Sequence, residues 1–418
     1  MPERPRSWTR TLQVVALTQV AILVGFNFSF PFLPLFIQEL GVTDRSEVAM
    51  WSGIVIGSGG ITMAIVSPVW GLLADRFGRK AMLVRSVASG SVMLAVQASI
   101  GSVWQLVGVR VLQGAFTGTQ TAAAMLLAGI VPAERTGFAL GLLSTAAQVG
   151  NLIGPVLGGL VVASVGLRTS FLVGAALLAV CTIVTIVYVN EGSVRRAPAV
   201  VGVRGNLRDV VTPFAWPLLR GVLVVGAATQ IAYSGSAAVL AIYLQDLARP
   251  SWLTTEVAVG LAFALGALAA AVAMPILGSY ADRHDPRALL VASLAVLAVG
   301  LVPQTLVPSA VVLLLCRIPV GVGLAGTTAA LSVLTRMGAP EGGEGRAFGA
   351  LAAVQNGGWG LGPIAGAALA AVAGIPALYV TSAVLAVVVM AAVWASPHWF
   401  PSIRPPASSP VVGISPAD

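Results

Sequence analysis

Charge is scarce in this chain of 418 residues, and that scarcity excludes a soluble globular protein. Only 9% of the residues are charged and 57% are hydrophobic, so charged side chains are too few to cover a surface in water. The net charge is basic, at +8. It does not indicate nucleic-acid binding, because the arginines lie in short loops rather than on one face of a domain.

Lysine, histidine and cysteine are nearly absent. The only lysine, Lys80, is not part of a GxxxxGK[ST] phosphate loop, so this chain alone cannot be an ATP-driven pump. Two histidines, His284 and His398, give no support to a metal site, and we expect neither a metal nor a cofactor. Cys181 and Cys316 lie in apolar runs and are interpreted as packing residues. A membrane enzyme is disfavoured, because the apolar runs hold no cluster of acids, histidines and serines.

The chain has long apolar runs instead. They cover about residues 12–40, 48–74, 81–100, 104–131, 138–165 and 169–189, and then 218–245, 255–280, 288–306, 308–335, 346–372 and 375–397. Each holds enough apolar residues for the ~20 that a spanning helix needs. We therefore predict an all-α membrane protein with twelve transmembrane helices. Two six-helix bundles, 1–190 and 218–400, would be joined by a cytoplasmic linker over 191–217 and followed by a disordered tail over 401–418.

The second half of the chain repeats the first at a spacing of 207 or 208 residues. GLLADRFGRK, which begins at Gly71, returns as GSYADRHDPR, which begins at Gly278. Arg110 is matched by Arg317, and the glycines of the run 138–165 are matched by those of the run 346–372. A repeat of this length fits a duplicated six-helix half, related to its twin in the same orientation by a pseudo-twofold axis.

The cations predict the orientation. The N-terminal arm, the loops on its side of the membrane, the linker and the tail hold 18 of the 23 arginines and lysines, whereas the opposite loops hold three. The remaining two, Arg110 and Arg317, lie inside apolar runs. This bias predicts that both termini are cytoplasmic in a multi-pass protein of the plasma or inner membrane.

The charged loop between the second and third runs cannot lie in hydrocarbon, so we place it at the membrane surface. A loop that only sets the topology is the simpler interpretation. Its repetition in the second half favours a conformational switch. The residues that we assign to this switch are Gly71, Asp75, Arg76, Gly78, Arg79, Lys80, Asp282 and Arg283.

Arg110 stands inside the fourth apolar run. A charge at such depth costs at least ~2.5–3.5 kcal/mol, so the side chain should face a wet cavity or a partner. The alternative is a structural arginine that caps carbonyls of neighbouring helices. Its counterpart, Arg317, precedes Pro319, which should bend that helix.

Glycines recur on one stripe of the fifth run, where small residues let helices pack closely. Ordinary packing explains any one of them, but Pro155 adds a kink that suits a hinge or a gate. The residues assigned to this packing are Gly141, Gly150, Gly154, Pro155, Gly158, Gly358, Gly362 and Pro363.

Three of these segments resemble signatures of the major facilitator superfamily, and the resemblance covers nearly all of residues 12–398. GLLADRFGRK matches the loop signature of that family, and RVLQG, beginning at Arg110, matches its helix-4 motif. The glycine–proline pattern from Gly141 to Gly158 is similar to the helix-5 motif of antiporters, above all twelve-helix drug:proton antiporters. FPFLPLFIQELGV, beginning at Phe30, resembles the MdtG-type branch of multidrug efflux transporters.

The resemblance implies a monomeric exporter of lipophilic compounds that exchanges them for protons by a rocker-switch motion in the lipid bilayer. It implies that Gly71 lets helix 2 approach helix 11 and that Asp75 sits beside the N-terminus of helix 11. Arg76 and Arg79 would complete a latch in the outward-facing state, and Arg110 would lie on the proton route. The helix-5 stripe would hold helices 5 and 8 together.

One departure concerns the proton carrier. Exporters of this kind often hold an acid deep in helix 1, 4, 7 or 10, whereas Asn27 occupies that depth here. The remaining candidates are Asp75 on one side, Glu39 with Asp246 on the other, or the substrate itself. Glu39 has an equally good interpretation as an ordinary charge at a helix end.

We expect an apolar cavity with a few polar groups, which tolerates many ligands. Its candidate residues are Asn27, Trp51, Gln113, Gln120, Gln148, Gln230, Tyr233, Gln355 and Trp359. Two alternatives stay open: a lipid or glycolipid flippase on the same scaffold, and an importer or sensor of a sugar or organic anion drawn by Arg110.

Overall fold

The computed structural model describes residues 6–132, 135–189, 215–340, 343–396 and 399–400. Within these residues the regular elements are helices, apart from one isolated bridge between Ala248 and Ser309. The predicted linker and tail lie almost entirely outside the described residues, so their boundaries stay predictions.

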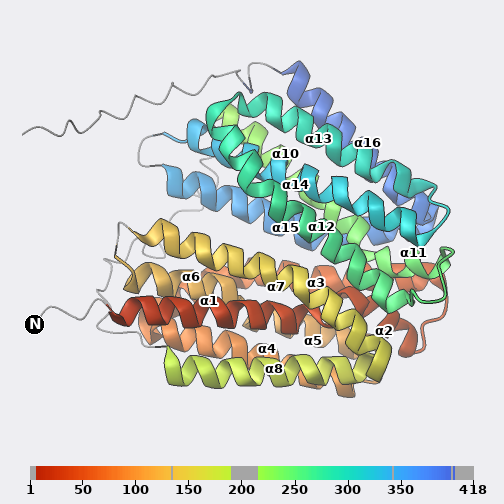
Figure 1. The fold of residues 1–418 in the computed structure, drawn as a ribbon, viewed down its shortest axis with the longest axis horizontal. Coiled ribbons are helices and arrows are strands. Elements are labelled where there is room, and N and C mark those ends of the chain that lie inside the picture. Colours follow the sequence, from red (N-terminus) through yellow and green to blue (C-terminus); the bar gives the residue numbers. More distant parts are fainter. Residues whose placement is uncertain (1–5, 133–134, 190–214, 341–342, 397–398, 401–418) are drawn as a thin grey trace, which may run out of the picture.

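The helices form two bundles, which follow one another along the chain (Figure 1). The first bundle consists of α1 (Arg6–Asn27), η1 (Phe30–Phe32), α2 (Leu33–Glu39), α3 (Arg45–Phe77), α4 (Arg79–Ser99), α5 (Val103–Phe116), α6 (Thr119–Ile130), α7 (Thr136–Val165) and α8 (Leu167–Tyr188). The second consists of α10 (Pro217–Ala238), α11 (Leu240–Asp246), α12 (Thr255–Arg283), α13 (Pro286–Leu301), η4 (Pro303–Thr305), α14 (Ala310–Gly338), α15 (Glu344–Ala373) and α16 (Ile375–Ala395).

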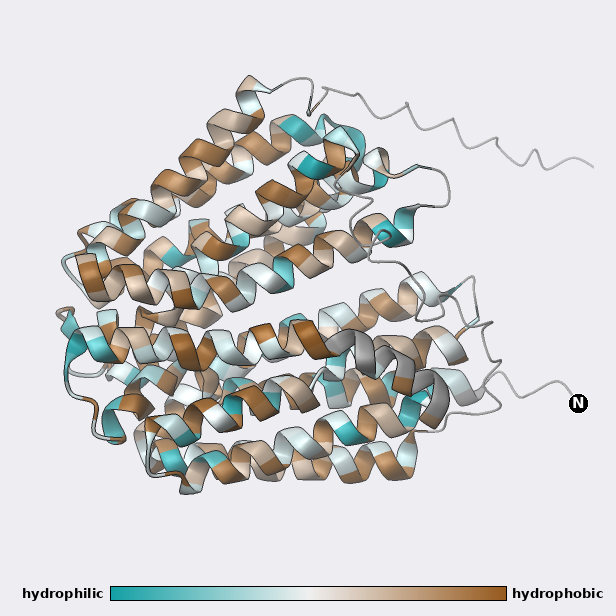
Figure 2. Ribbon diagram, turned by 180° about the vertical axis from the view of Figure 1, so that it is seen from behind, coloured by the Kyte–Doolittle hydropathy of each residue, from teal (hydrophilic) through white to brown (hydrophobic). Residues whose placement is uncertain are grey.

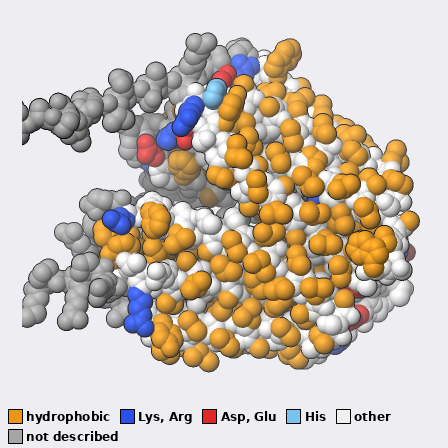
Figure 3. All heavy atoms as spheres, viewed as in Figure 1, with side chains coloured by type: hydrophobic (Ala, Val, Ile, Leu, Met, Phe, Trp, Pro, Cys, Tyr) orange, Lys and Arg blue, Asp and Glu red, His pale blue; other side chains and the backbone are white. Residues whose placement is uncertain are grey.

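Ten of these helices are long and apolar enough to cross a membrane. They correspond to all the predicted spans except the fourth, which is divided into α5 and α6, and the eleventh, which is α15. The count of twelve spans therefore stays a prediction. Hydrophobic residues recur along the helices (Figure 2), and hydrophobic side chains are spread over the visible face of the molecule (Figure 3). That surface suits lipid and not water.

Three predicted helices are interrupted, which corrects the sequence-based boundaries. The run 12–40 ends as an α-helix at Asn27 and continues as η1 and α2. Pro31 and Pro34 have no N–H to donate to the carbonyls four residues back, and the Phe32 N–H bonds to Ser29 instead, at 3.0 Å. The run 218–245 is interrupted only at Val239, between α10 and α11.

The run 104–131 breaks at Gly118, whose φ of 116° is a left-handed value that favours glycine. The break frees two carbonyls, and neighbouring helices satisfy both. Trp70 Nε1 donates to Ala115 O at 2.5 Å, and Ser89 Oγ donates to Phe116 O at 2.9 Å. Ala325 stands at the matching position of the second half, and α14 is continuous there. The break is thus a difference between the halves.

Corresponding contacts recur in both halves at the spacing of the sequence repeat. Arg110 Nε donates to Val55 O, and Arg317 Nε donates to Ala262 O. The side chain of Lys80 binds the carbonyl of Ile186 near the end of α8. In the second half, Arg287 binds the carbonyl of Trp394 near the end of α16. Structurally equivalent partners at this spacing support the duplication inferred from the sequence.

The two halves meet mainly through α3 with α15 and α7 with α12. We call the end at which α1 begins the near end, and the end that holds α2 and α11 the far end (Figure 1). The closest approaches lie toward the far end. A Cβ on Gly60 would stand 3.0 Å from Gly360 Cα, and one on Gly159 would stand 2.6 Å from Glu256 O. Toward the near end the halves diverge, and the surface between them is hollowed (Figure 3).

Gly114 and Gly108 of α5 allow a matched test of this packing. A Cβ on Gly114 would lie closer to the carbonyl of Gly59 on α3 than atoms can approach, whereas Gly108 faces open space. We predict that Gly114→Ala lowers the thermal unfolding midpoint in detergent, because overpacking costs about 1–3 kcal/mol. Gly108→Ala should leave the midpoint unchanged. Equal midpoints for the two variants would contradict the close contact between α3 and α5.

Candidate functional site

Three aromatic rings link two deep arginines across the boundary between the halves. Phe30 of η1 lies 6.2 Å from Trp359 of α15, and Trp359 lies 6.2 Å from Tyr233 of α10, centroid to centroid. The guanidinium of Arg110 stands 5.4 Å from the Phe30 ring, and that of Arg317 stands 5.6 Å from the Tyr233 ring. All three rings are half-buried. The sequence predicted Tyr233 and Trp359 for the cavity but did not single out Phe30.

Arg110 is held by neutral acceptors. Its Nε donates to Val55 O at 3.3 Å, and its Nη1 donates to Gln113 Oε1 at 2.6 Å. Gln97 of α4 donates to the same oxygen at 3.1 Å. Gln113 is thus buried between α4 and α5, where it orients Arg110. This corrects its assignment to the cavity wall.

Arg317 is more deeply enclosed than its counterpart, with only 1% of its surface exposed. Its Nε donates to Ala262 O at 3.4 Å, while its buried Nη1 has no hydrogen-bond partner among the described residues. An unsatisfied buried donor costs free energy, and a charged donor costs more than a neutral one. The second half therefore retains an arginine at a site that does not satisfy it fully.

The first half contributes a chain of amides that begins at Asn27, three residues before Phe30. Asn27 Nδ2 donates to Asn151 Oδ1 at 3.0 Å, and Asn151 Nδ2 reaches Gln148 Oε1 at 3.3 Å. Asn27 and Gln148 were predicted from the sequence, but Asn151 was not. Its signal was present, because an asparagine follows Gly150 inside an apolar run, and the repeat places it opposite Trp359.

The other predicted cavity residues are divided between this region and places away from it. Gln230 lies where α10 meets α15, since a Cβ on Gly358 would stand 2.8 Å from its Cβ. Gln355 is half-buried on α15, and Gln120 is exposed on α6, after the break. Trp51 packs edge-to-face on Trp104 at 4.7 Å, where the far ends of α3 and α5 meet. Trp51 is therefore not part of the central group, which corrects its assignment.

The glycine stripe of α7 packs against α1, not against α12 as expected. Cβ atoms on Gly150, Gly154 and Gly158 would stand 2.6, 2.6 and 2.5 Å from Leu23 Cβ, Asn27 Cβ and Phe28 O. The spacing predicted a close contact, but it could not identify the neighbouring helix. The approach to α12 is made next to the stripe, by Pro155, whose carbonyl faces Gly260.

The second half has the same arrangement, with α15 on α10. Gly362 faces Ile231 and Ser234, and Ser234 Oγ donates to Gly358 O at 3.0 Å. Pro363 lies elsewhere, because its carbonyl faces Gly53 of α3 across the boundary between the halves. Gly141 has open space around it, so its assignment to helix packing is wrong.

The switch loop is described only in part, because the structure does not describe the surroundings of Gly71, Asp75 and Arg76. Gly78 has a φ of 93° and begins the turn into α4. Arg79 donates to Met125 O at 2.8 Å, and Lys80 donates to Ile186 O at 2.8 Å, both in the same half.

The matching loop of the second half has a similar pattern. Asp282 pairs with Arg336 at 3.1 Å, and Arg283 ends α12. The contact between Asp282 and Arg336 stays within the second half, as the contacts of Arg79 and Lys80 stay within the first. Such an arrangement fits halves that are apart at the near end.

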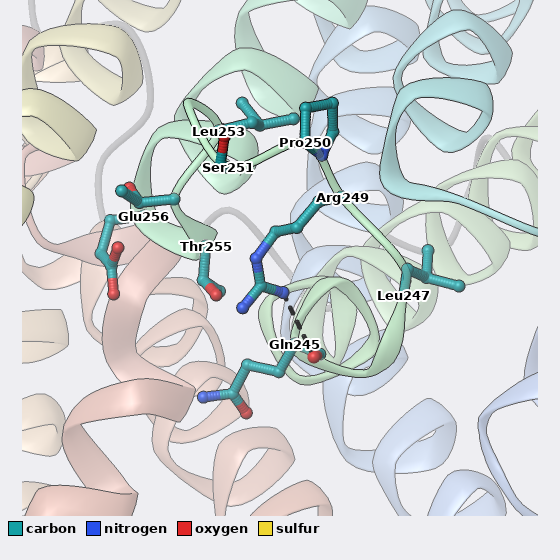
Figure 4. A pocket seen from close by; sticks show the side chains of 9 residues that line it. Gln245, Leu247, Arg249, Pro250, Ser251, Leu253, Thr255 and Glu256 are labelled. Atoms are coloured by element: carbon teal, nitrogen blue, oxygen red, sulfur yellow. Dashed lines mark hydrogen bonds between the residues drawn. The ribbon is translucent and has the colours of Figure 1, made fainter.

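Side chains close the far end. Arg45 forms an ion pair with Asp246 across the halves, and it also donates to Ile242 O at 3.2 Å. Gln38 and Gln245, which are related by the repeat, exchange two amide hydrogen bonds of 2.9 and 3.0 Å. A pocket of about 610 Å³ lies beside this contact, with Arg249 projecting into it (Figure 4).

Asp44 fixes the start of α3 at this end. Its carboxylate accepts hydrogen bonds from the N–H groups of Ser46 and Glu47, both at 3.0 Å. A hydrogen bond from the Ser46 hydroxyl and then one from the Glu47 N–H lower the pKa of Asp44, so the cap stays charged at neutral pH. The cap thereby holds the N-terminus of α3, from which Arg45 reaches Asp246.

Arg85 is a third arginine inside an apolar run, although the count of cations on each side of the membrane placed it with the loops. It lies in α4, with its guanidinium 3.3 Å from the centre of the Trp70 ring. Its Nε and Nη1 are buried without a hydrogen-bond partner among the described residues. Its position only a few residues inside the apolar run concealed it.

Comparison with known proteins agrees with this architecture. A family model described as Major Facilitator Superfamily matches residues 15–255 and 222–414. The chain belongs to this superfamily. It is therefore a membrane transporter, and its apolar helices make it a multi-pass protein of the inner membrane.

Among its relatives is "Multidrug resistance protein MdtG" of Yersinia enterocolitica, which is 33% identical over 92% of this chain and 93% of the relative. The protein of that name from Escherichia coli K12 is 32% identical over 91% and 93%. A bacterial homologue of the lysosomal transporter Spinster, solved inward-facing and occupied, superposes with a TM-score of 0.76 at 15% identity, over 95% of this chain and 98% of that one. The nucleoside transporter NupG superposes with a TM-score of 0.74 at 16% identity, over 93% and 98%. At such identity the two structures show the fold alone.

A cross-linking experiment tests the far-end contact of this superfamily member. Cysteines at Gln38 and Gln245 should form a disulfide under mild oxidation, in a chain that carries serine at Cys181 and Cys316. A protease site between residues 190 and 214 would then separate the halves on a gel unless they are cross-linked. We predict that Arg45→Asp or Asp246→Arg alone lowers the cross-linked fraction several-fold, because each places like charges together.

The double reversal, Arg45→Asp with Asp246→Arg, is the control. It should restore the cross-link, because it rebuilds an ion pair of the opposite polarity. If both single reversals cross-link as well as the parent, the ion pair does not hold the far end closed.

Proposed function

We propose that this protein exports amphipathic and lipophilic compounds from the cytoplasm, as a multidrug efflux transporter, in exchange for protons. The observation that carries the proposal is a half-buried site of aromatic rings, amides and a deep arginine between two halves that are closed at one end only. Apolar walls with a few polar groups tolerate ligands of many shapes. The relatives named for multidrug resistance, which match over more than nine-tenths of the chain, favour the same function.

The geometry supports alternating access by a rocker-switch motion. With the near end at the cytoplasm, as the distribution of cations predicts, the structure is inward-facing. The glycines where α3 meets α15 and α7 meets α12 would act as pivots, because backbones in direct contact can roll without side chains to displace. Opening the far end requires the Arg45–Asp246 pair to separate. Closing the near end would engage the Asp75 loop as a latch on the N-terminus of α15.

Proton coupling needs a group that titrates, and Arg110 cannot be that group. A guanidinium stays charged at biological pH, so its part is to bias a carboxylate or a substrate that shares the route. Asp75, Glu39 and Asp246 are the candidate carriers; Glu39 is exposed at the end of α2, and Asp246 is bound to Arg45. One charge moved across the membrane is worth ~2.3 kcal/mol per 100 mV, which supports roughly a fiftyfold gradient.

The proposal is tested in proteoliposomes with an imposed pH step. A panel of one neutral, one cationic and one anionic lipophilic dye covers the possible substrate charges. We expect at least one dye to move against its gradient when the pH step is applied, and to stop when an ionophore abolishes the step. If transport ignores both the pH step and the membrane potential, proton antiport is wrong, and a lipid flippase or a uniporter accounts better for the fold.

Asp75→Asn tests the latch. We predict that this variant inserts and folds but loses transport, because an amide gives up the negative charge that the helix dipole and the loop cations attract. Asp285→Asn is the matched control, since it lies in the corresponding loop and an asparagine still caps α13. Dye transport by Asp75→Asn at the rate of the control would exclude the latch.

A further inference from the structure

We propose that the central site prefers aromatic anions, with the substrate supplying the negative charge that the deep arginines lack. The inference rests on the proposed transport function and narrows its substrate class. It follows from three features of the site: unpaired positive charge, a row of aromatic rings, and different surroundings for the two arginines.

Among the described residues, no carboxylate balances the charge of the site. The two ion pairs of the described residues, Arg45 with Asp246 and Arg336 with Asp282, lie at the far and near ends, with side chains 45–59% exposed. Arg110 is held by a carbonyl and an amide, and Arg317 by a carbonyl alone. Two positive charges therefore face the interior without a carboxylate.

None of the described acids forms an ion pair with Arg110 or Arg317. Asp75 lies twenty residues along α3 from Val55, the residue that binds Arg110, which is about 30 Å at the rise of an α-helix. A charge in a region of low dielectric attracts an opposite charge strongly, so the counterion must come with the ligand.

The rings between the arginines favour a flat ligand. Trp359 is steeply inclined to both neighbours, at 55° to Phe30 and 78° to Tyr233. An aromatic ligand placed among them can meet ring faces and ring edges, which are the favourable geometries for aromatic pairs. The two halves differ here, because the repeat places Asn151 where the other half has Trp359. The equivalent position thus carries a ring in one half and an amide in the other.

The two arginines would contribute to anion binding in different ways. Arg110 is only half-buried, and its two hydrogen bonds use Nε and Nη1. It is the group that can contact a carboxylate or sulfonate directly. Arg317 is almost fully enclosed behind Tyr233, so it contributes through its positive field. The same field should repel lipophilic cations, which sets this site apart from one that holds a deep acid.

Binding to the purified protein in lipid nanodiscs tests the inference, with titration calorimetry and three probes of one shape. The probes are 2-naphthoate, 2-naphthalenemethanol and 2-naphthyltrimethylammonium. We expect naphthoate to bind at least about tenfold more tightly than the alcohol, because a hydrogen bond to a charged group is worth that much. The ammonium compound should bind most weakly.

Variants identify the groups responsible. Arg110→Gln should remove the preference for naphthoate over the alcohol. Arg110→Lys keeps the positive charge and should retain most of the preference, which distinguishes loss of the charge from misfolding. Arg85→Gln is the control, because Arg85 is also an arginine within a helix but stacks on Trp70, away from the site. Trp359→Leu should weaken the binding of naphthoate several-fold more than the binding of decanoate, an anion without a ring.

The outcomes separate this inference from the proposed function. Tight binding of the ammonium compound, or a naphthoate preference that survives Arg110→Gln, overturns the anion site. If the anion site fails while a cationic dye is exported on a pH step, the transport function stands without it. If naphthoate binds as expected but neither it nor any dye is transported, the site stands and the exporter is wrong.

Discussion

Two arginines inside an apolar bundle impose the constraint on which this structure depends. A guanidinium cannot give up its proton, and lipid offers it no hydrogen-bond partners, so the fold must provide both depth and solvation. Each half does so in the same way. The neighbouring helix that offers a carbonyl to the arginine also brings a glycine into contact with the helix that carries the arginine. Arg110 binds Val55 O and Gly114 meets Gly59, while Arg317 binds Ala262 O and Gly321 meets Gly266. The same arrangement therefore provides both close helix contact and hydrogen bonding to the arginine, and it occurs once in each half.

The two halves depart from symmetry at two places, the break at Gly118 and the equivalent positions of Asn151 and Trp359. Gly118 breaks the helix that carries Arg110, whereas Ala325 leaves the equivalent helix continuous. Asn151 and Trp359 occupy equivalent positions with opposite chemistry, one an amide and one a large ring. The two halves thus share one framework and differ in the residues at these positions.

The sequence was sufficient for the fold and for two of the arginines inside apolar runs, but not for Arg85. Arg110 and Arg317 could be found because a charge in an apolar run is conspicuous, and the repeat could be found because its signatures keep one spacing. The sequence was insufficient to identify which helices pack against one another. The stripe at Gly150 and Gly154 gives the face of a helix but not the helix that covers it, so α1 could not be distinguished from α12. Gly118 could not be recognised as a break, because glycine is common throughout this chain, with 47 copies.

Rocking of the two halves about their glycine contacts would expose one site to each side of the membrane in turn. Spin-label distances at both ends test it most directly. Gly137 and Gly345 face open space at the near end and can carry one pair of labels, and the exposed Glu47 and Ser251 can carry another at the far end. The account predicts that a transported dye with a pH step shortens the near-end distance and lengthens the far-end distance in the same molecules. Transport that proceeds while both distances stay fixed would contradict it.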